Sequence, residues 1–228
     1  MSDSATPFSR NRNQRRRTPR PPPPISTNDF ERAALRHLDR YPCSTADLRA
    51  VLERRAQRSH AHHGGDPAEA EALIEMTVSR MHEQGLLDDR RYGKALARRL
   101  RTRGGSLRRI AVRLHEKGIA SHLRAEVLEE AGGDEAELAA ARTYARRRRL
   151  GVHRQGPHPG FLAPMEPFQK GENQKGQNQR SENQRSESQE AESQESAEAQ
   201  RRQRQRDLAA LARAGFAFAQ AIQALDSD

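Results

Sequence analysis

The sequence has few of the residues that fill a large hydrophobic core. It contains no tryptophan, aromatic residues make up 4% of its 228 positions, and the apolar fraction is 33%. Lysine, arginine and histidine together account for more than a fifth of the chain. Such a composition excludes one large core over the whole length, although the length alone would allow one or two ordinary domains.

Cysteine and long apolar runs are also scarce. The single cysteine, Cys43, excludes an intramolecular disulfide framework and favours a reducing compartment. It has no evident Cys or His partner in the sequence, so we interpret it as a structural thiol beside the turn at Tyr41 and Pro42. No run approaches the ~20 apolar residues of a membrane helix, and the N-terminus lacks the apolar segment of a secretory signal. We therefore expect a cytoplasmic protein that does not bind membranes.

The motifs of common catalytic sites are absent as well. The sequence has no P-loop, no G-x-S-x-G, no H-E-x-x-H and no Cys/His constellation. Asp88 and Asp89 could form a metal or acid–base pair, but adjacent carboxylates at a helix start more often cap the helix and complement its dipole. We therefore expect no catalytic residue, no cofactor and no enzyme activity.

Three histidines, His60, His62 and His63, are dense enough to suggest a metal site. A real site would need them held on a scaffold with a fourth ligand and a second shell of hydrogen bonds, whereas Gly64 and Gly65 follow at once. We therefore expect residues 58–67 to form a solvated loop without a bound metal.

What the chain has in excess is positive charge. It carries 41 Lys and Arg against 31 Asp and Glu, a net charge of +10, with a sequence pI near 10.8. Such a potential attracts phosphate and raises encounter rates with polyanions, so it favours a nucleic acid or nucleoprotein partner. A generally basic proteome or a basic tail would give the same numbers, and the composition alone leaves that alternative open.

The N-terminal part divides into an arm and a helical unit. Residues 1–27 combine an arginine run with Pro21 to Pro24, which predicts a disordered basic arm with a polyproline stretch. Residues 28–87 follow as a unit of three helices, with a start at Asn28, an end at Tyr41 before Pro42, and a restart at Ser44. The inward positions of its third helix are predicted to include Leu73, Ile74, Thr77, Val78 and Met81.

A second unit is predicted over residues 88–133, from helix-capping residues at both ends of its helices. Asp88 and Ser106 stand where N-caps belong, because their side-chain oxygens can accept otherwise unpaired amide protons. Gly85 and Gly118 each follow an apolar helical pattern, where glycine takes the left-handed conformation at low cost.

A third unit is predicted over residues 134–228, with a capping-box start at Asp134 and Glu137. A polar, low-complexity insertion at 152–199 interrupts it and is expected to be disordered, and helix is expected to return near Ala199. Placing Gly215 on Gly118 aligns Leu211 with Leu114, which makes the third unit a weak repeat of the second. We therefore expect an all-α protein of three tandem three-helix modules, about nine helices in total, each stabilised by its neighbour.

The order of motifs resembles the RecX family of bacterial regulators of the RecA recombinase. The resemblance rests on LLDD-x-x-Y, then Arg-x-Gly-Gly-Ser-x-x-x-Ile, then Leu-x-x-Lys-Gly-Ile, with an echo near the C-terminus. The motif residues are Leu86, Leu87, Asp88, Asp89, Tyr92, Gly118, Ile119, Gly215 and Phe216. The resemblance implies an elongated, curved array that lies in the groove of the RecA filament on single-stranded DNA and restrains its ATPase and strand exchange. We expect it to act as a monomer.

Two rows of basic residues are the candidate binding site. The first row is at spacings of three and four on one helix, and the second is at spacings of four on the next. Few acidic residues lie near them in sequence, so the rows are either a binding face or a plain solvated face, and we favour the binding face. The predicted filament- or DNA-binding residues are Arg91, Lys94, Arg98, Arg101, Arg109, Arg113 and Lys117.

Two other classes of protein compete with this interpretation. Residues 107–130, with a glycine between two helices, have the length of a helix-turn-helix that binds duplex DNA without RecA. The stronger charge precedes Gly118 rather than following it, which disfavours that class. A purely structural helical scaffold would be indifferent to DNA and to salt.

Overall fold

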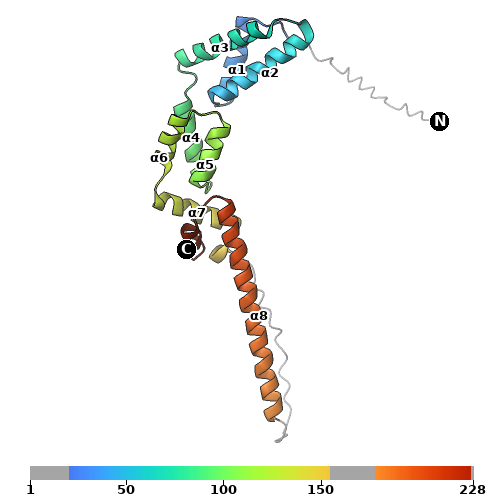
Figure 1. The fold of residues 1–228 in the computed structure, drawn as a ribbon, viewed down its shortest axis with the longest axis vertical. Helices are drawn as coiled ribbons and strands as arrows, with labels where there is room; N and C mark the ends of the chain where they lie inside the picture. Colours follow the sequence, from blue (N-terminus) through green and yellow to red (C-terminus); the bar gives the residue numbers. More distant parts are fainter. Residues whose placement is uncertain (1–20, 155–177, 227–228) are drawn as a thin grey trace, which may run out of the picture.

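The computed structural model describes residues 21–154 and 178–226, and within them every regular element is helical. The all-α prediction is therefore confirmed, as is the tandem arrangement of small modules. Figure 1 shows the modules following one another along an elongated, bent molecule, with α8 projecting from one end. Residues 1–20 of the predicted arm and 155–177 of the predicted insertion lie outside the described residues. None of the described helices is long and apolar enough to cross a membrane.

The first module packs α1 (Thr27–Arg40), α2 (Thr45–His63) and α3 (Pro67–Glu83) around one apolar cluster. Its largest fully buried side chains are Phe30, Leu48, Leu52 and Met81. Helix α1 begins one residue before the predicted Asn28, because Ser26 is the N-cap and its hydroxyl oxygen accepts the amide proton of Asp29 at 3.2 Å.

The predicted loop at residues 58–67 is wrong in its N-terminal half, because α2 continues to His63. Ser59 is buried and donates to the carbonyl oxygen of Pro23 at 2.8 Å, and His63 Nε2 lies 2.7 Å from the carbonyl oxygen of Pro22. The proline segment thus lies along this last part of α2 and is not a free arm. Gly64, with φ of +69°, ends the helix. No cluster of three potential metal ligands occurs among the described residues.

The second module packs α4 (Asp89–Arg101), α5 (Leu107–Glu116) and α6 (Ser121–Ala131) around a separate cluster. Both predicted N-caps are confirmed: Asp88 accepts the amide proton of Arg91 at 2.8 Å, and Ser106 accepts that of Arg109 at 3.2 Å. The buried side chains of this module are Leu96, Ala97, Ile110, Leu114, Ile119 and Val127.

The third module consists of α7 (Asp134–Arg148), a short 3₁₀ turn η1 (Gly151–His153), α8 (Asn178–Arg213) and α9 (Phe218–Asp226). Helix α8 begins well before the expected Ala199. Most of residues 178–199 are Gln, Glu, Arg or Ala, which are strong helix formers, so this part of α8 forms without an apolar stripe. The predicted capping box at Asp134 is also wrong: Gly133 precedes α7 without a side-chain cap.

The junction between the first two modules rests on two motif residues. Asp89 Oδ1, at the start of α4, accepts the amide proton of Thr45 at 2.8 Å. A Cβ atom on Gly118 would lie 2.4 Å from the Cβ atom of Ala46, so only glycine allows this approach. Lys117 Nζ adds a bond of 2.9 Å to Asp47 Oδ2. The N-terminal turn of α2 is therefore held by the start of α4 and by the residues that follow α5.

The junction between the second and third modules repeats this construction. The amide of Leu107, the residue after the N-cap Ser106, donates to the carboxylate of Glu137 on α7 at 3.1 Å. A Cβ atom on Gly215, which follows α8, would meet Ser106 Oγ at 2.8 Å and the Cβ atom of Arg108 at 3.0 Å. In both junctions the amide of the residue after an N-cap serine donates to a carboxylate on the first helix of the next module. The glycine that follows the second helix of that module packs closely against the same turn.

Candidate functional site

The second module carries both predicted rows of basic residues, one on α4 and one on α5. Residues 88–133 contain twelve Lys and Arg and six Asp and Glu. Helices α4 and α5 pack Leu96, Ala97, Ile110 and Leu114 into the module core.

The row on α4 divides into two pairs. Lys94 and Arg101 turn toward the C-terminal side of α6: Lys94 Nζ lies 2.5 Å from Glu130, and Arg101 donates to the carbonyl oxygen of Ala131 at 2.8 Å. Arg101 also pairs with Glu137 at 2.5 Å, and the two side chains are only 14% and 8% exposed. The prediction that this row lacks compensating acids is wrong for these two residues, because the acids come from α6 and α7.

Arg91 and Arg98 form the exposed half of the α4 row. Neither guanidinium group is joined by an ion pair to a carboxylate within the described ranges. The pKa of Glu130 is lowered chiefly by the hydrogen bond from Lys94 and further by the charges of Lys94 and Arg98. The outer side of α4 therefore presents arginine charge to solvent next to one acidic residue.

The row on α5 also divides. Arg109 and Arg113 are exposed, and Arg113 Nη1 is 2.6 Å from Glu116, in a pair that is about half exposed on both sides. Exposed pairs of this kind contribute little and are easily exchanged for another anion. Lys117 is half-buried against Asp47 and belongs to the module junction.

Sequence reasoning missed Arg99, which is close enough to Tyr92 for its charge to act on that side chain. The pKa of Tyr92 is raised mainly by burial, and the nearby charges of Lys117 and Arg99 oppose that rise. The pKa of Arg113 is raised mainly by its hydrogen bond to Glu116 and by the charge of that carboxylate. The spacing of seven residues between Tyr92 and Arg99 places them on one face of a helix and could have identified this residue. Arg99 is exposed and adds another positive charge to α4.

Comparison with curated proteins gives three relatives with one name. The chain is 34% identical over 215 residues to "Regulatory protein RecX" of Myxococcus xanthus (strain DK1622), a match that covers 94% of each chain. It is 30% identical over 123 residues to the protein of the same name from Agrobacterium fabrum, with 54% of this chain and 64% of the relative covered.

The chain belongs to the RecX family. A third relative of that name, from Halorhodospira halophila, is 36% identical over 116 residues, which cover 51% of this chain and 63% of that one. No protein-family model matches the chain, and no solved structure matches it.

The motif residues of this RecX-family chain are mainly structural. Leu87 packs in the core of the first module, Ile119 in that of the second and Phe216 in that of the third. Leu86 is 47% exposed. The others are the cap, carboxylate and glycine positions described above, and Tyr92 is half-buried beside the second core. The motif residues therefore stabilise the modules and their junctions. The exposed arginines lie on the helices between these motif residues.

Proposed function

We propose that this protein binds the RecA filament on single-stranded DNA and lowers its ATPase, strand-exchange and co-protease activities, and so regulates DNA repair and the SOS response. Its relatives are named regulatory proteins, and 94% of the chain matches one of them. We also propose that the protein acts as a cytoplasmic monomer without enzymatic activity.

The observation that carries this proposal is the exposed arginine set on the central module. Arg91 and Arg98 on α4 and Arg109 and Arg113 on α5 are exposed on helices whose other sides are fixed by packing. Arginine suits forked contacts with phosphate or carboxylate oxygens. These four residues contact the filament, whereas Lys94, Arg101 and Lys117 act indirectly, since their ion pairs hold α6 and the neighbouring modules in place.

The shape of the molecule agrees with this role. Three small modules in series give an elongated, bent array, and such arrays offer extended binding surfaces (Figure 1). The central module lies between the other two, so a long partner that binds its arginines can also contact the first and third modules.

A helix-turn-helix made of α5 and α6 is less consistent with the side chains. The helix that would enter a DNA groove, α6, carries three glutamates and one arginine, and Arg124 donates to the carbonyl oxygen of Ile119 at 2.7 Å. That arrangement presents negative charge toward a phosphate backbone. Charged contacts to duplex DNA would have to come from α5 alone.

To test this proposal, the purified protein is added in substoichiometric amounts to RecA on single-stranded DNA, and the rate of ATP hydrolysis is measured. We expect the rate of hydrolysis to fall. Unchanged hydrolysis at one protein per RecA monomer would contradict the proposal. Tight, sequence-specific binding to duplex DNA in the absence of RecA would favour the helix-turn-helix class instead.

A further inference from the structure

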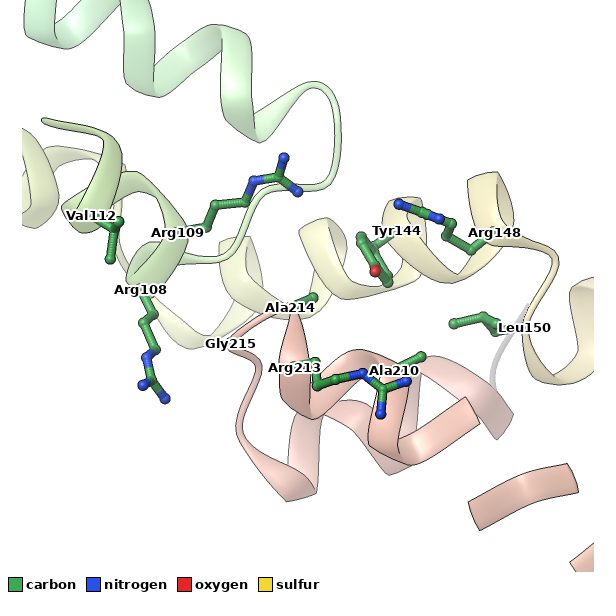
Figure 2. Close-up of a pocket in the computed structure, with 10 residues that line it drawn as sticks. All are labelled: Arg108, Arg109, Val112, Tyr144, Arg148, Leu150, Ala210, Arg213, Ala214 and Gly215. Carbon is green, nitrogen blue, oxygen red and sulfur yellow. The ribbon is translucent and has the colours of Figure 1, made fainter. Parts of the chain in front are cut away.

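A concave pocket lies where the second and third modules meet. Helices α5, α7 and α8 enclose a volume of about 650 Å³, and Figure 2 shows the residues that line it. Pockets of roughly 300–1,000 Å³ hold small-molecule or nucleotide-sized groups. Its lining residues are Arg108, Arg109, Val112, Tyr144, Arg148, Leu150, Ala210, Arg213, Ala214 and Gly215.

The charge of the pocket has one sign. Of the described residues that line it, four are arginines and none is acidic. Among the described residues no ion pair joins Arg109, Arg148 or Arg213 to a carboxylate, in contrast to Lys94 and Arg101. Guanidinium groups from three different helices therefore gather around one hollow without an internal counter-charge.

Figure 2 shows how these groups are distributed. Arg109 and Arg148 lie on either side of Tyr144, Arg213 enters from α8, and Arg108 points away from them. The guanidinium carbon of Arg148 is 5.7 Å from the centre of the Tyr144 ring, a cation–π contact that holds this arginine over the pocket wall. Arg109, Arg148 and Arg213 are therefore the guanidinium groups that the pocket offers to an anionic ligand.

The remaining wall of the pocket is apolar. Val112 is 53% exposed, and Leu150, Ala210 and Ala214 belong to or pack against the third core. A glutamate side chain would use the arginines but leave this wall uncovered. A nucleotide presents a phosphate for the guanidinium groups and the flat, weakly polar surface of its sugar and base for the apolar side chains.

Further basic residues extend away from the pocket. Arg113 is one turn beyond Arg109 on α5, and Arg147 Nη1 donates to the carbonyl oxygen of Arg103 at 3.2 Å, which joins α7 to the end of α4. Arg103 and Arg147 are both exposed. A phosphodiester chain has a charge at every nucleotide, so it can continue from the pocket along these residues.

We propose that this pocket holds one or two nucleotides of single-stranded DNA, with Arg148 and Arg213 binding phosphates against the wall of Val112 and Tyr144. The biological setting of this contact, a filament that contains single-stranded DNA, rests on the proposed function. The contact itself requires no other protein, so its test can be made without RecA.

The experiment measures binding of a fluorescein-labelled oligothymidylate to the full-length protein by fluorescence anisotropy, from about 50 to about 300 mM NaCl. The variant is Arg148→Glu/Arg213→Glu. The control is Arg36→Glu/Arg58→Glu, two exposed arginines of the first module, with the same change in net charge. Helical circular dichroism confirms folding, and Arg148→Gln/Arg213→Gln serves as a milder variant should charge reversal unfold the third module.

The pocket variant is expected to bind at least about tenfold more weakly at low salt, and its salt slope is expected to fall by about 1.4, or ~0.7 for each of two lost phosphate contacts. The control is expected to lose less than about threefold. An equal loss in the control, or wild-type binding by both pocket variants, would overturn the proposal. A deca-glutamate peptide that displaces the DNA as effectively as unlabelled oligothymidylate would overturn the choice of nucleotide and indicate an acidic protein segment.

Discussion

Arg101 shows how one side chain of a basic row takes a structural role. Its guanidinium group binds the carbonyl oxygens of Gly105 and Ala131 and the carboxylate of Glu137. The same carboxylate accepts the amide proton of Leu107. This buried pair therefore ends α4, positions α5 and attaches α7, and both charges are satisfied by several hydrogen bonds.

We predict that Glu137→Gln destabilises the protein by about 3 kcal/mol, because removing one partner leaves a buried charge uncompensated. The matched control is Glu116→Gln, which removes the exposed partner of Arg113 and is expected to cost less than about 1 kcal/mol. Urea denaturation followed by circular dichroism measures both. Equal, small effects of the two substitutions would contradict the structural role of the Arg101–Glu137 pair.

Single residues could be assigned from sequence only where their partners are local. Asp88 and Ser106 cap helices through amides three residues away, so local pattern was enough to predict them. Arg98 and Arg101 look alike in the sequence. Only the fold brings Glu137, 36 residues away, to one of them and not to the other.

At the scale of helices, the boundaries depend on local signals and on packing. The glycine after α5 and the proline after α1 end helices as predicted, since each acts only on the backbone at or next to its own position. The extent of α2 was not predictable, because its last turn is held by the carbonyl oxygens of Pro22 and Pro23. The early start of α8 reflects helix propensity in a segment without an apolar pattern.

Two glycines that end helices allow backbone strain to be separated from packing. Gly85 and Gly118 have φ of +68° and +67°, but a Cβ atom on Gly85 meets nothing within 4 Å, whereas one on Gly118 would clash with Ala46. We predict that Gly85→Ala costs about 1 kcal/mol from the left-handed backbone alone. Gly118→Ala should cost about 2 kcal/mol more, because the first module is displaced.

The control for that comparison is the double variant Ala46→Gly/Gly118→Ala. Removing the Ala46 methyl group should relieve the clash and improve the urea midpoint relative to Gly118→Ala alone. No improvement, or equal losses for the two single glycine variants, would show that the junction does not depend on this close approach.

Over the part of the chain that the structure describes, three separate cores are joined by two junctions of the same construction. Each core has few large side chains, so each module gains stability from its neighbours. The repeat was detectable in the sequence from the alignment of Gly215 with Gly118. The pocket between α5, α7 and α8 was not, since its arginines come from residues 108 to 213 and meet only in the folded array.

We propose that the exposed arginines of α4 and α5 together bind the RecA filament. The most direct measurement is the effect of the triple variant Arg98→Glu/Arg109→Glu/Arg113→Glu on ATP hydrolysis by RecA on single-stranded DNA. Its matched control is Arg36→Glu/Arg54→Glu/Arg58→Glu, three exposed arginines of the first module. We predict that the triple variant keeps its helical content but no longer lowers hydrolysis, while the control lowers it nearly as well as the wild type. Inhibition by the triple variant at wild-type concentrations would show that these arginines do not bind the filament.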